Sequence, residues 1–353
     1  MKVLHLAAGN RWTGAAAPAF AEVEALRHAG VDAHYAYVGG YKLEAKIGHL
    51  DFTHPVIERS QNPIAFQRSA GAIRELIDRH GFDLVHAHLT YDHWLARFAA
   101  GDRAFLARTF HAQRVIRRDP LTQVLMSATD AVFIVNDAFR RAAALREHHP
   151  IFTPPPVDER QFHPNGPNVR ATYGLGEASP VIAAIGKLSA GRGFETVLQA
   201  FAILRTRLDS ARLMIIGHGE HRPVLEMLAS QLGVAPHVVW AGYREGDLAE
   251  HYRAADLLFF TAAGSDAGHR AILEAMACGV VPVTAPLPGV HALLRGFDPL
   301  IAAGTSAAAI AARGIEVWTR GTTALHDRLR HHSDQFAYPR AAERLKTAYA
   351  TLM

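Results

Sequence analysis

Apolar runs alternate with amphipathic segments over most of this chain. The runs are continuous, which is the pattern of strands buried on both faces of a sheet. They predict strands in two series, at residues 3–8, 33–38, 83–88, 105–111 and 131–135, and then at residues 181–185, 213–216, 238–240, 257–261 and 280–284. Amphipathic patterns in the gaps predict helices, for example at residues 18–28, 64–79, 194–208 and 267–277. This alternation predicts an α/β fold with parallel sheets covered by helices.

The two series of strands are separated by a segment rich in Pro, Asn and Gly at residues 153–168, which is unsuited to helix or central strand. We therefore expect a linker here and a domain boundary near Pro167. The expected domains are residues 1–166 and 167–335, and we expect residues 336–353 to form a helix that packs back on the first domain. Doubly wound domains bind ligands at the carboxyl ends of their strands, so we expect a central cleft there.

Composition narrows the class of protein. Hydrophobic residues make up 49% of the 353 residues and charged residues 20%, as in ordinary soluble globular proteins. The formal net charge of +4 suits an anionic ligand or membrane surface, and is also common in proteins that bind neither. The single cysteine, Cys278, excludes an intramolecular disulfide and a cysteine-based zinc site. The 22 histidines are scattered rather than clustered at metal-ligand spacings.

The first chemical motif is GKLSAGRG, from Gly186 to Gly193, between a predicted strand and a predicted helix. Glycines let a backbone turn tightly and approach a ligand. Lys187 and Arg192 flank the turn, and a helix N-terminus with nearby cations is suited to bind an anion. A solvated turn with two surface cations would have the same sequence, so the motif alone leaves both interpretations open.

The second motif, GSDAGHRAILEAMACG, covers residues 264–279 and follows the predicted strand at 257–261. With Asp266 in the loop before the helix, Glu274 lies about two turns into it. Two such acceptors could bind two hydroxyl-bearing parts of one ligand. Alternatively, Asp266 caps the helix and Glu274 is a surface charge. The apolar neighbours of Glu274, which include Leu273 and Met276, favour the first interpretation.

The order and spacing of these motifs resemble the C-terminal half of retaining glycosyltransferases of family 4, which have the GT-B fold. The resemblance is closest over residues 181–283, where LMIIGHGE and EAMACGVVPV follow GKLSAGRG. Weaker matches extend into the first half at HAH (86–88), TFH (109–111) and PPPVD (154–158). The resemblance implies two Rossmann-like domains facing a central cleft and sugar transfer from a nucleoside-diphosphate sugar, with no metal.

The resemblance also implies site residues. Lys187 and Arg192 would contact the donor diphosphate, Glu274 the ribose, and Asp266 and His111 the transferred sugar. The remaining donor-binding positions implied are Gly14, Gly186, Gly217, Gly219, Tyr243, Gly268, His269 and Arg270. The chain departs from the family where the two cations exchange Arg and Lys, where Asp266 replaces a glutamate and where His269 replaces a glycine. It also has one glycine, Gly14, where the family often has two, and PPVD at residues 155–158 where the family has P-N-G-V-D. Asp-x-Asp is absent from the chain, which argues against a metal-held diphosphate.

Family habit favours a UDP-sugar over a GDP-sugar, with a glycan or lipid-linked saccharide as acceptor in cell-surface polysaccharide or glycoconjugate biosynthesis. His86 and His88 would line the acceptor side or stabilise their loop. A basic cluster in the first half suggests peripheral contact with the inner face of a membrane, in an otherwise cytoplasmic protein, although a solvated basic face is the alternative. The cluster consists of Arg108, Arg114, Arg117 and Arg118.

Other functions stay open at this point. One is a second enzyme on the same fold, such as a nucleotide-sugar epimerase or a glycogen-type phosphorylase; the short chain weighs against the latter. Another is a non-catalytic nucleotide-sugar-binding protein, which the departures at Asp266 and His269 would allow. Nucleic-acid binding has little support, because the basic residues are dispersed and there is no stacked-aromatic motif.

Overall fold

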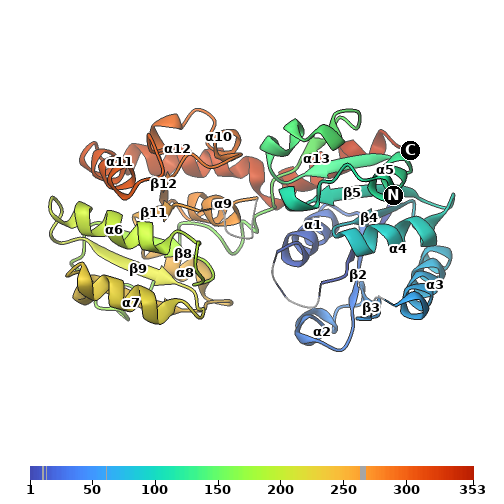
Figure 1. Ribbon diagram of the computed structural model, residues 1–353, viewed down its shortest axis with the longest axis horizontal. Coiled ribbons are helices and arrows are strands. Elements are labelled where there is room, and N and C mark those ends of the chain that lie inside the picture. The colour runs from blue at the N-terminus through green and yellow to red at the C-terminus, as the bar shows by residue number, and fades with distance from the viewer. Residues whose placement is uncertain (10–11, 13, 61, 263–267) are drawn as a thin grey trace. The chain divides into compact units, whose positions relative to one another are not determined.

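The computed structural model describes residues 1–9, 12, 14–60, 62–262 and 268–353 (Figure 1). These residues form two compact units. Unit 1 contains the described residues between 1 and 158, together with residues 268 and 336–353. Unit 2 contains residues 159–262 and 269–335.

Unit 1 is built on a parallel sheet with the strand order β3-β2-β1-β4-β5-β6-β7. Its strands are β1 Lys2–Ala7, β2 Asp32–Val38, β3 Thr53–Ile57, β4 Leu84–Ala87, β5 Phe105–Phe110, β6 Ala131–Ile134 and β7 Ile151–Phe152. Its α-helices are α1 Ala16–His28, α2 Lys42–Ile47, α3 Pro63–His80, α4 Thr90–Ala100, α5 Pro120–Ser127 and α13 Tyr338–Ala350. Short 3₁₀ helices lie at Gln113–Val115, Asp137–Arg141 and Ala143–Leu145. A further one, Asp334–Phe336, crosses from unit 2 into unit 1, because Phe336 is the first residue of the C-terminal segment of unit 1.

Successive residues of β1 face opposite sides of this sheet, and each side has its own core. Val3 packs with Phe20 of α1 and Leu345 of α13, whereas Leu4 packs in the core that includes Ile73 of α3. Helix α13 packs on α1, which holds the C-terminal segment in unit 1. Both faces of the sheet are therefore covered, which accounts for the continuous apolar runs.

Unit 2 contains a second parallel sheet, with the order β10-β9-β8-β11-β12. Its strands are β8 Val181–Ile185, β9 Arg212–Ile216, β10 Val238–Gly242, β11 Leu257–Phe260 and β12 Val281–Thr284. Its α-helices are α6 Phe194–Arg205, α7 Arg222–Gln231, α8 Leu248–Arg253, α9 Arg270–Ala277, α10 Val290–Leu293, α11 Ala307–Thr319 and α12 Thr323–Ser333. Short 3₁₀ helices lie at Ala235–His237 and Asp298–Leu300.

A strand is present at each of the ten places where an apolar run predicts one, with ends that differ by no more than two residues. Two further strands, β3 and β7, were not predicted. Strand β3 has the sequence THPVI, whose polar and proline residues suit an edge, and β7 has only two residues. They lie at the two edges of their sheet, and neither has the apolar run on which the prediction depends.

The units divide between Asp158 and Glu159, earlier in the chain than the boundary expected near Pro167. Arg253 of α8 explains the difference. Its guanidinium donates hydrogen bonds to the carbonyl oxygens of His163 and Pro167, at 3.2 and 2.7 Å. This segment is thus part of unit 2 although it contains no helix or strand.

No helix in the described part of the chain is both long enough and apolar enough to cross a membrane.

Candidate functional site

The order in which strands are added to the sheet of unit 2 reverses at β8. From β8 the chain builds β9 and β10 on one side, and it then returns to place β11 and β12 on the other. Loops that follow the two strands at such a switch point diverge, and ligands of doubly wound folds bind at this carboxyl edge. The loop after β8 is residues 186–193, and α9 is the first helix after β11. The first motif therefore begins at this edge, and the described part of the second motif follows the neighbouring strand.

The loop after β8 packs on the loop after β9 through backbone contacts. Leu188 donates its N–H to the carbonyl of His218 and accepts from the N–H of His221, both at 3.0 Å. A Cβ atom on Gly219 would lie 2.0 Å from the carbonyl oxygen of Leu188, and one on Gly217 would lie 1.9 Å from that of Gly186. Gly217 and Gly219 are therefore needed for the packing of the two loops, whatever they contribute to a ligand.

Substituting Gly219 by alanine tests this packing. The φ angle of Gly219 is not in the left-handed region, so the substitution adds only the clash with Leu188. We expect a loss of roughly 1–3 kcal/mol in the free energy of unfolding, the usual cost of overpacking. Urea unfolding measures it, with Gly246→Ala as the matched control because no atom lies within 4 Å of a Cβ there. Equal stability of the two variants would contradict the expectation.

The loop after β8 is also fixed to the end of β11. The Thr261 hydroxyl donates a hydrogen bond of 2.8 Å to the carbonyl oxygen of Gly193. Gly193 is the N-cap of α6 and has no side chain with which to cap it. The first turn of a helix has unsatisfied N–H groups and a partial positive charge, and such a terminus favours an anion.

Two cations stand on this loop. The Lys187 amine lies 3.5 Å from Glu220 Oε2, and both side chains are exposed, so this ion pair is weak and easily exchanged. Arg192 is partly buried and forms no ion pair with any residue that the structure describes. Both cations can thus interact with an anion at the N-terminus of α6.

Glu274 projects from α9 into the interior, and only 6% of the residue is exposed. The Tyr252 hydroxyl donates to its Oε2 at 3.1 Å, and Arg270 Nε lies 3.1 Å from its Oε1. Burial and the carboxylate raise the pKa of Tyr252 well above its usual value, so this hydroxyl stays protonated. The alternative that Glu274 is an idle surface charge is wrong. Each carboxylate oxygen can accept more than one hydrogen bond, so these two contacts do not use up its capacity to accept one from a ligand hydroxyl.

His269 immediately precedes α9 and has a left-handed backbone, with φ +53°. Glycine adopts this conformation most easily, which gives a physical reason for the glycine at this place in the family pattern. Here the buried imidazole compensates, because it donates to the carbonyl oxygen of Pro288 at 2.8 Å and packs edge-on against Phe260. Gly268, just before it, is buried.

Of the other expected donor-site residues, Tyr243 is exposed and packs against the His218 ring, and Gly14 has a left-handed φ of +61° just before α1. Asp266, with its neighbours from residue 263 to residue 267, lies outside the described residues.

In unit 1, His111 directly follows β5. Its Nε2 lies 2.9 Å from Nδ1 of His88, and burial lowers its pKa to about 3. A neutral imidazole at pH 7 can exchange hydrogen bonds with a hydroxyl but is not a general acid. His86 and His88 are fully buried, so the expectation that they line the acceptor side is wrong, and they stabilise the interior instead.

Arg108 is buried, so the expectation that it belongs to a basic surface cluster is wrong. It lies in β5 and is only 1% exposed, with its guanidinium 4.9 Å from the centre of the Phe110 ring. It is therefore not part of a surface cluster. The three other arginines of the expected cluster are exposed: Arg114, Arg117 and Arg118.

One group of residues was missed. The histidines that are scattered in the sequence are gathered by the fold, where His5, His86 and His88 surround Glu22 in the interior of unit 1. The HAH sequence at a strand end was the available signal, but its partners come from β1 and α1.

Known proteins resemble this chain in sequence. The profile of the family described as glycosyl transferases group 1 matches residues 167–332. The GDP-mannose-dependent alpha-(1-6)-phosphatidylinositol monomannoside mannosyltransferase of Mycolicibacterium smegmatis is 32% identical over 296 residues, which cover 75% of this chain and 74% of the relative. The N-acetyl-alpha-D-glucosaminyl L-malate synthase of Bacillus anthracis is 25% identical over 248 residues, which cover 65% and 63%.

Solved structures resemble the fold. A glycosyltransferase from Rickettsia africae ESF-5 superposes with a TM-score of 0.84 at 16% identity, over 99% of this chain and 98% of that one. HepE of Anabaena in complex with UDP superposes with a TM-score of 0.82 at 16% identity, over 99% and 100%. These likenesses confirm the prediction of two Rossmann-like units of the GT-B type. With the match to the family profile and 32% identity over most of both chains, the protein belongs to the glycosyl transferases group 1 and is a glycosyltransferase.

Proposed function

We propose that this glycosyltransferase is a retaining enzyme of family 4 that uses a nucleoside-diphosphate sugar. The observation that carries the proposal is the loop at residues 186–193, where Lys187, Arg192 and the N-terminus of α6 stand at the switch point of unit 2. Negative charge develops on the diphosphate as the sugar leaves. Cations and a helix N-terminus fixed in advance stabilise that charge, and they need no metal to do so.

The other residues have roles around this diphosphate. Glu274 accepts hydrogen bonds from the ribose hydroxyls, and Asp266 contacts the transferred sugar. Neutral His111 exchanges a hydrogen bond with a sugar hydroxyl. The departing phosphate itself accepts the proton of the acceptor hydroxyl, so no protein nucleophile takes part. The acceptor is a glycan or a lipid-linked saccharide of a cell-surface polysaccharide or glycoconjugate.

A thermal-shift screen tests the donor class. Family habit favours a UDP-sugar, whereas the name of the mycobacterial relative gives GDP-mannose, so UDP-glucose and GDP-mannose are the first pair to compare. A ligand that binds only the folded state raises the apparent Tm. We expect one nucleotide series to raise it, and no shift with any nucleoside diphosphate would overturn the proposal. A second assay measures the release of nucleoside diphosphate with and without an acceptor. Release that requires the acceptor indicates transfer, and it distinguishes transfer from epimerisation and from binding without turnover.

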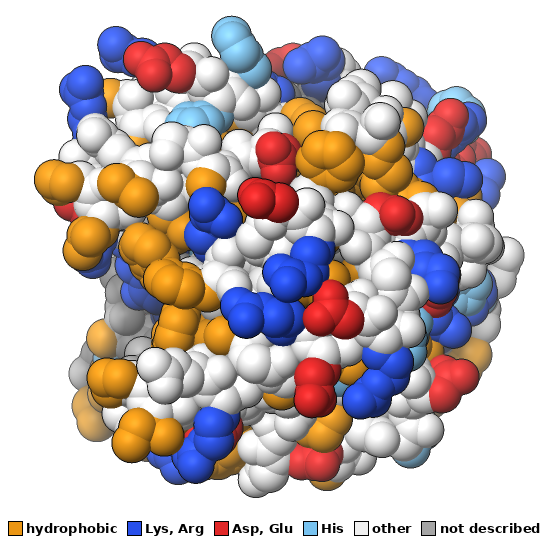
Figure 2. Space-filling view, turned by 90° about the vertical axis from the view of Figure 1, so that its right-hand side faces the viewer, with side chains coloured by type: hydrophobic (Ala, Val, Ile, Leu, Met, Phe, Trp, Pro, Cys, Tyr) orange, Lys and Arg blue, Asp and Glu red, His pale blue; other side chains and the backbone are white. Residues whose placement is uncertain are grey.

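We further propose that unit 1 contacts an anionic membrane surface, which suits a lipid-linked acceptor. Exposed Arg114, Arg117 and Arg118 lie between β5 and α5, and on α5 Leu121 is 69% and Val124 is 64% exposed. Basic side chains next to exposed apolar ones are typical of interfacial segments. Figure 2 shows hydrophobic side chains beside lysine and arginine side chains on the face at the right of Figure 1.

Co-sedimentation with vesicles of anionic lipid measures this contact. We expect binding at low salt that falls about fivefold for each of Arg117→Gln and Arg118→Gln, since one basic residue contributes about 1 kcal/mol at such a surface. Leu121→Ser should weaken binding as well. Met227→Ser, at an exposed apolar position of unit 2, is the control that should not. Failure of the wild-type protein to sediment at low salt would exclude the membrane contact.

A further inference from the structure

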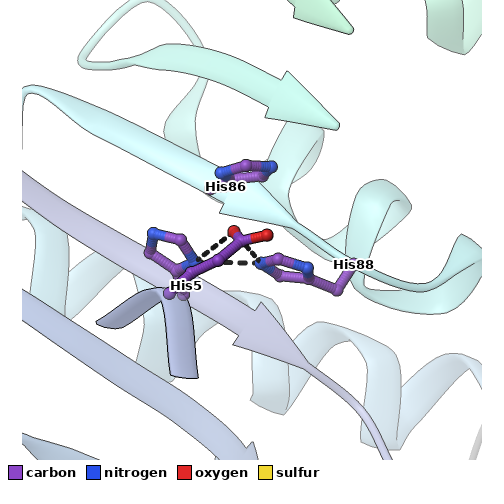
Figure 3. A group of neighbouring side chains, drawn as sticks. His5, His86 and His88 are labelled. Atoms are coloured by element: carbon purple, nitrogen blue, oxygen red, sulfur yellow. Dashed lines mark hydrogen bonds and ion pairs between the residues drawn. The ribbon is translucent and has the colours of Figure 1, made fainter. Parts of the chain in front are cut away.

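Four side chains that can bind a metal meet inside unit 1. His5 lies on β1, His86 on the adjacent strand β4, and His88 just after β4, as Figure 3 shows. The parallel register pairs His5 with His86, and Glu22 joins them from α1. All four are buried, and one nitrogen or oxygen atom of each lies within 4.8 Å of those of the others.

Three of these atoms form a triangle of the size of a metal site. His5 Nδ1 and His88 Nε2 are 2.9 Å apart, and each is 3.8 Å from Glu22 Oε2. The point equidistant from the three atoms lies about 2.1 Å from each, which is the length of zinc bonds to imidazole nitrogen and carboxylate oxygen. An ion at that point would lie in the plane of the three atoms. A tetrahedral site therefore needs the two imidazole nitrogens to move apart by roughly 0.5 Å, which small rotations of the two rings would supply.

Glu22 Oε2 also needs a partner. It is buried and accepts no hydrogen bond from any described residue. A polar oxygen is costly to bury in this way, and an ionised carboxylate still more so. His5 and His88 meanwhile direct two nitrogens at each other, and these nitrogens share at most one proton without repulsion. One divalent cation would satisfy all three atoms.

The surrounding hydrogen bonds fit the protonation that metal binding requires. With Nδ1 on the metal, His5 carries its proton on Nε2, which lies 3.4 Å from the Tyr349 hydroxyl oxygen. That hydroxyl can then donate to His86 Nδ1 at 2.6 Å, and His86 Nε2–H to Thr109 Oγ1 at 2.6 Å. Each proton thus has one acceptor. Metal-bound histidines usually have such a partner on the second nitrogen, and His86 supplies part of this outer layer.

We propose that unit 1 binds a divalent transition-metal ion of the Zn²⁺ class through His5 Nδ1, His88 Nε2 and Glu22. Two histidines and one carboxylate are a donor set found in zinc and other transition-metal sites with an open position, which a water molecule completes here. This site is distinct from the donor diphosphate, for which no metal is proposed.

The ion has a consequence for His111. With Nε2 on the metal, His88 carries its proton on Nδ1 and donates it to His111 Nε2, 2.9 Å away. His111 then carries its own proton on Nδ1, so the metal fixes the tautomer that His111 presents to a ligand. This consequence rests on the proposed function of His111, whereas the metal site does not.

Cobalt binding to the full-length protein tests the site. The protein is dialysed against EDTA and titrated with Co²⁺ alone while its visible spectrum and Tm are recorded. We expect one equivalent to bind, with a visible absorption band that Zn²⁺ abolishes, and a raised Tm. Glu22→Gln and His88→Gln should lose the band. His54→Gln should keep it, because His54 pairs with His34 in a separate histidine pair.

Two results would overturn the proposal: a folded wild-type protein that binds no stoichiometric Co²⁺, and an unchanged band in both site variants. Circular dichroism checks that the variants fold. If they do not, paramagnetic shifts of the His5 and His88 ring protons in the wild-type protein decide, and their absence would also count against the site. Nucleotide-induced shifts in Tm, measured on the same metal-free protein, test the proposed function separately.

Discussion

Replacing Lys187 or Arg192 by alanine is expected to reduce turnover at least tenfold in a protein that remains folded. Both side chains lie on the loop that leads into α6, and neither is part of the core. Removing one group that stabilises developing charge costs about 2.7–4 kcal/mol in well-studied sites. Because the charge on the diphosphate grows as the sugar leaves, the loss should fall mainly on kcat rather than on KM.

Steady-state release of nucleoside diphosphate measures both constants. Arg207→Ala is the matched control, since Arg207 is an exposed cation just beyond the other end of α6 and should be dispensable. The exchanges Lys187→Arg and Arg192→Lys keep the charge but alter its geometry, because a guanidinium is a planar fork and an ammonium a point charge. They should retain more activity than the alanine variants. Unchanged turnover in both alanine variants would refute the assignment to the diphosphate.

The sequence predicted the sheets well because their strands are buried on both faces. A run such as Val181–Ile185 is apolar throughout and ends at a glycine, so its boundaries are visible without the structure. Strands β3 and β7 lie at the edges of a sheet, where polar residues and proline are tolerated, and they have no such run.

The candidate site was predictable only where it is contiguous in sequence. The loop at residues 186–193 is one motif, and its two cations are where the motif places them. That Gly217 and Gly219 meet a ligand stays a prediction, and the structure adds that a Cβ on either would clash with the backbone of Gly186 or Leu188. The sequence contains the glycines but not the loop against which they pack.

Long-range assembly explains what was missed. His5, Glu22 and His88 come from three separate parts of unit 1. The parallel register of β1 and β4 brings the histidines together, and the packing of α1 on the sheet adds Glu22. Arg108 was expected at the surface but is buried. The sequence favours a surface position because charged residues are seldom fully buried without a partner. Burial lowers the pKa of Arg108 to about 10, while the charge of buried Asp92 acts in the other direction and compensates part of that cost.

Glu274→Gln is expected to weaken the binding of nucleoside diphosphate about tenfold to a hundredfold, because a hydrogen bond to a charged group contributes about 1.5–3 kcal/mol. Glutamine keeps the size of the side chain and removes its charge, so the fold of α9 should be preserved. Isothermal titration with the matching 2′-deoxy and 3′-deoxy nucleotides sharpens the test. Wild-type protein should lose affinity for at least one deoxy compound, whereas the variant should discriminate much less.

Tyr252→Phe is the control for the interior contacts of this carboxylate. It removes the 3.1 Å hydrogen bond to Glu274 Oε2 and leaves the charge in place. We expect it to lower stability by about 1 kcal/mol, the usual net contribution of one hydrogen bond, and to change nucleotide affinity less than Glu274→Gln does. Should the two variants bind nucleotide as the wild-type protein does, Glu274 would have no ribose role. Its contacts with Tyr252 and Arg270 would then serve only to hold α9 in place. Of the proposed donor contacts, those of the loop at residues 186–193 with the diphosphate would remain.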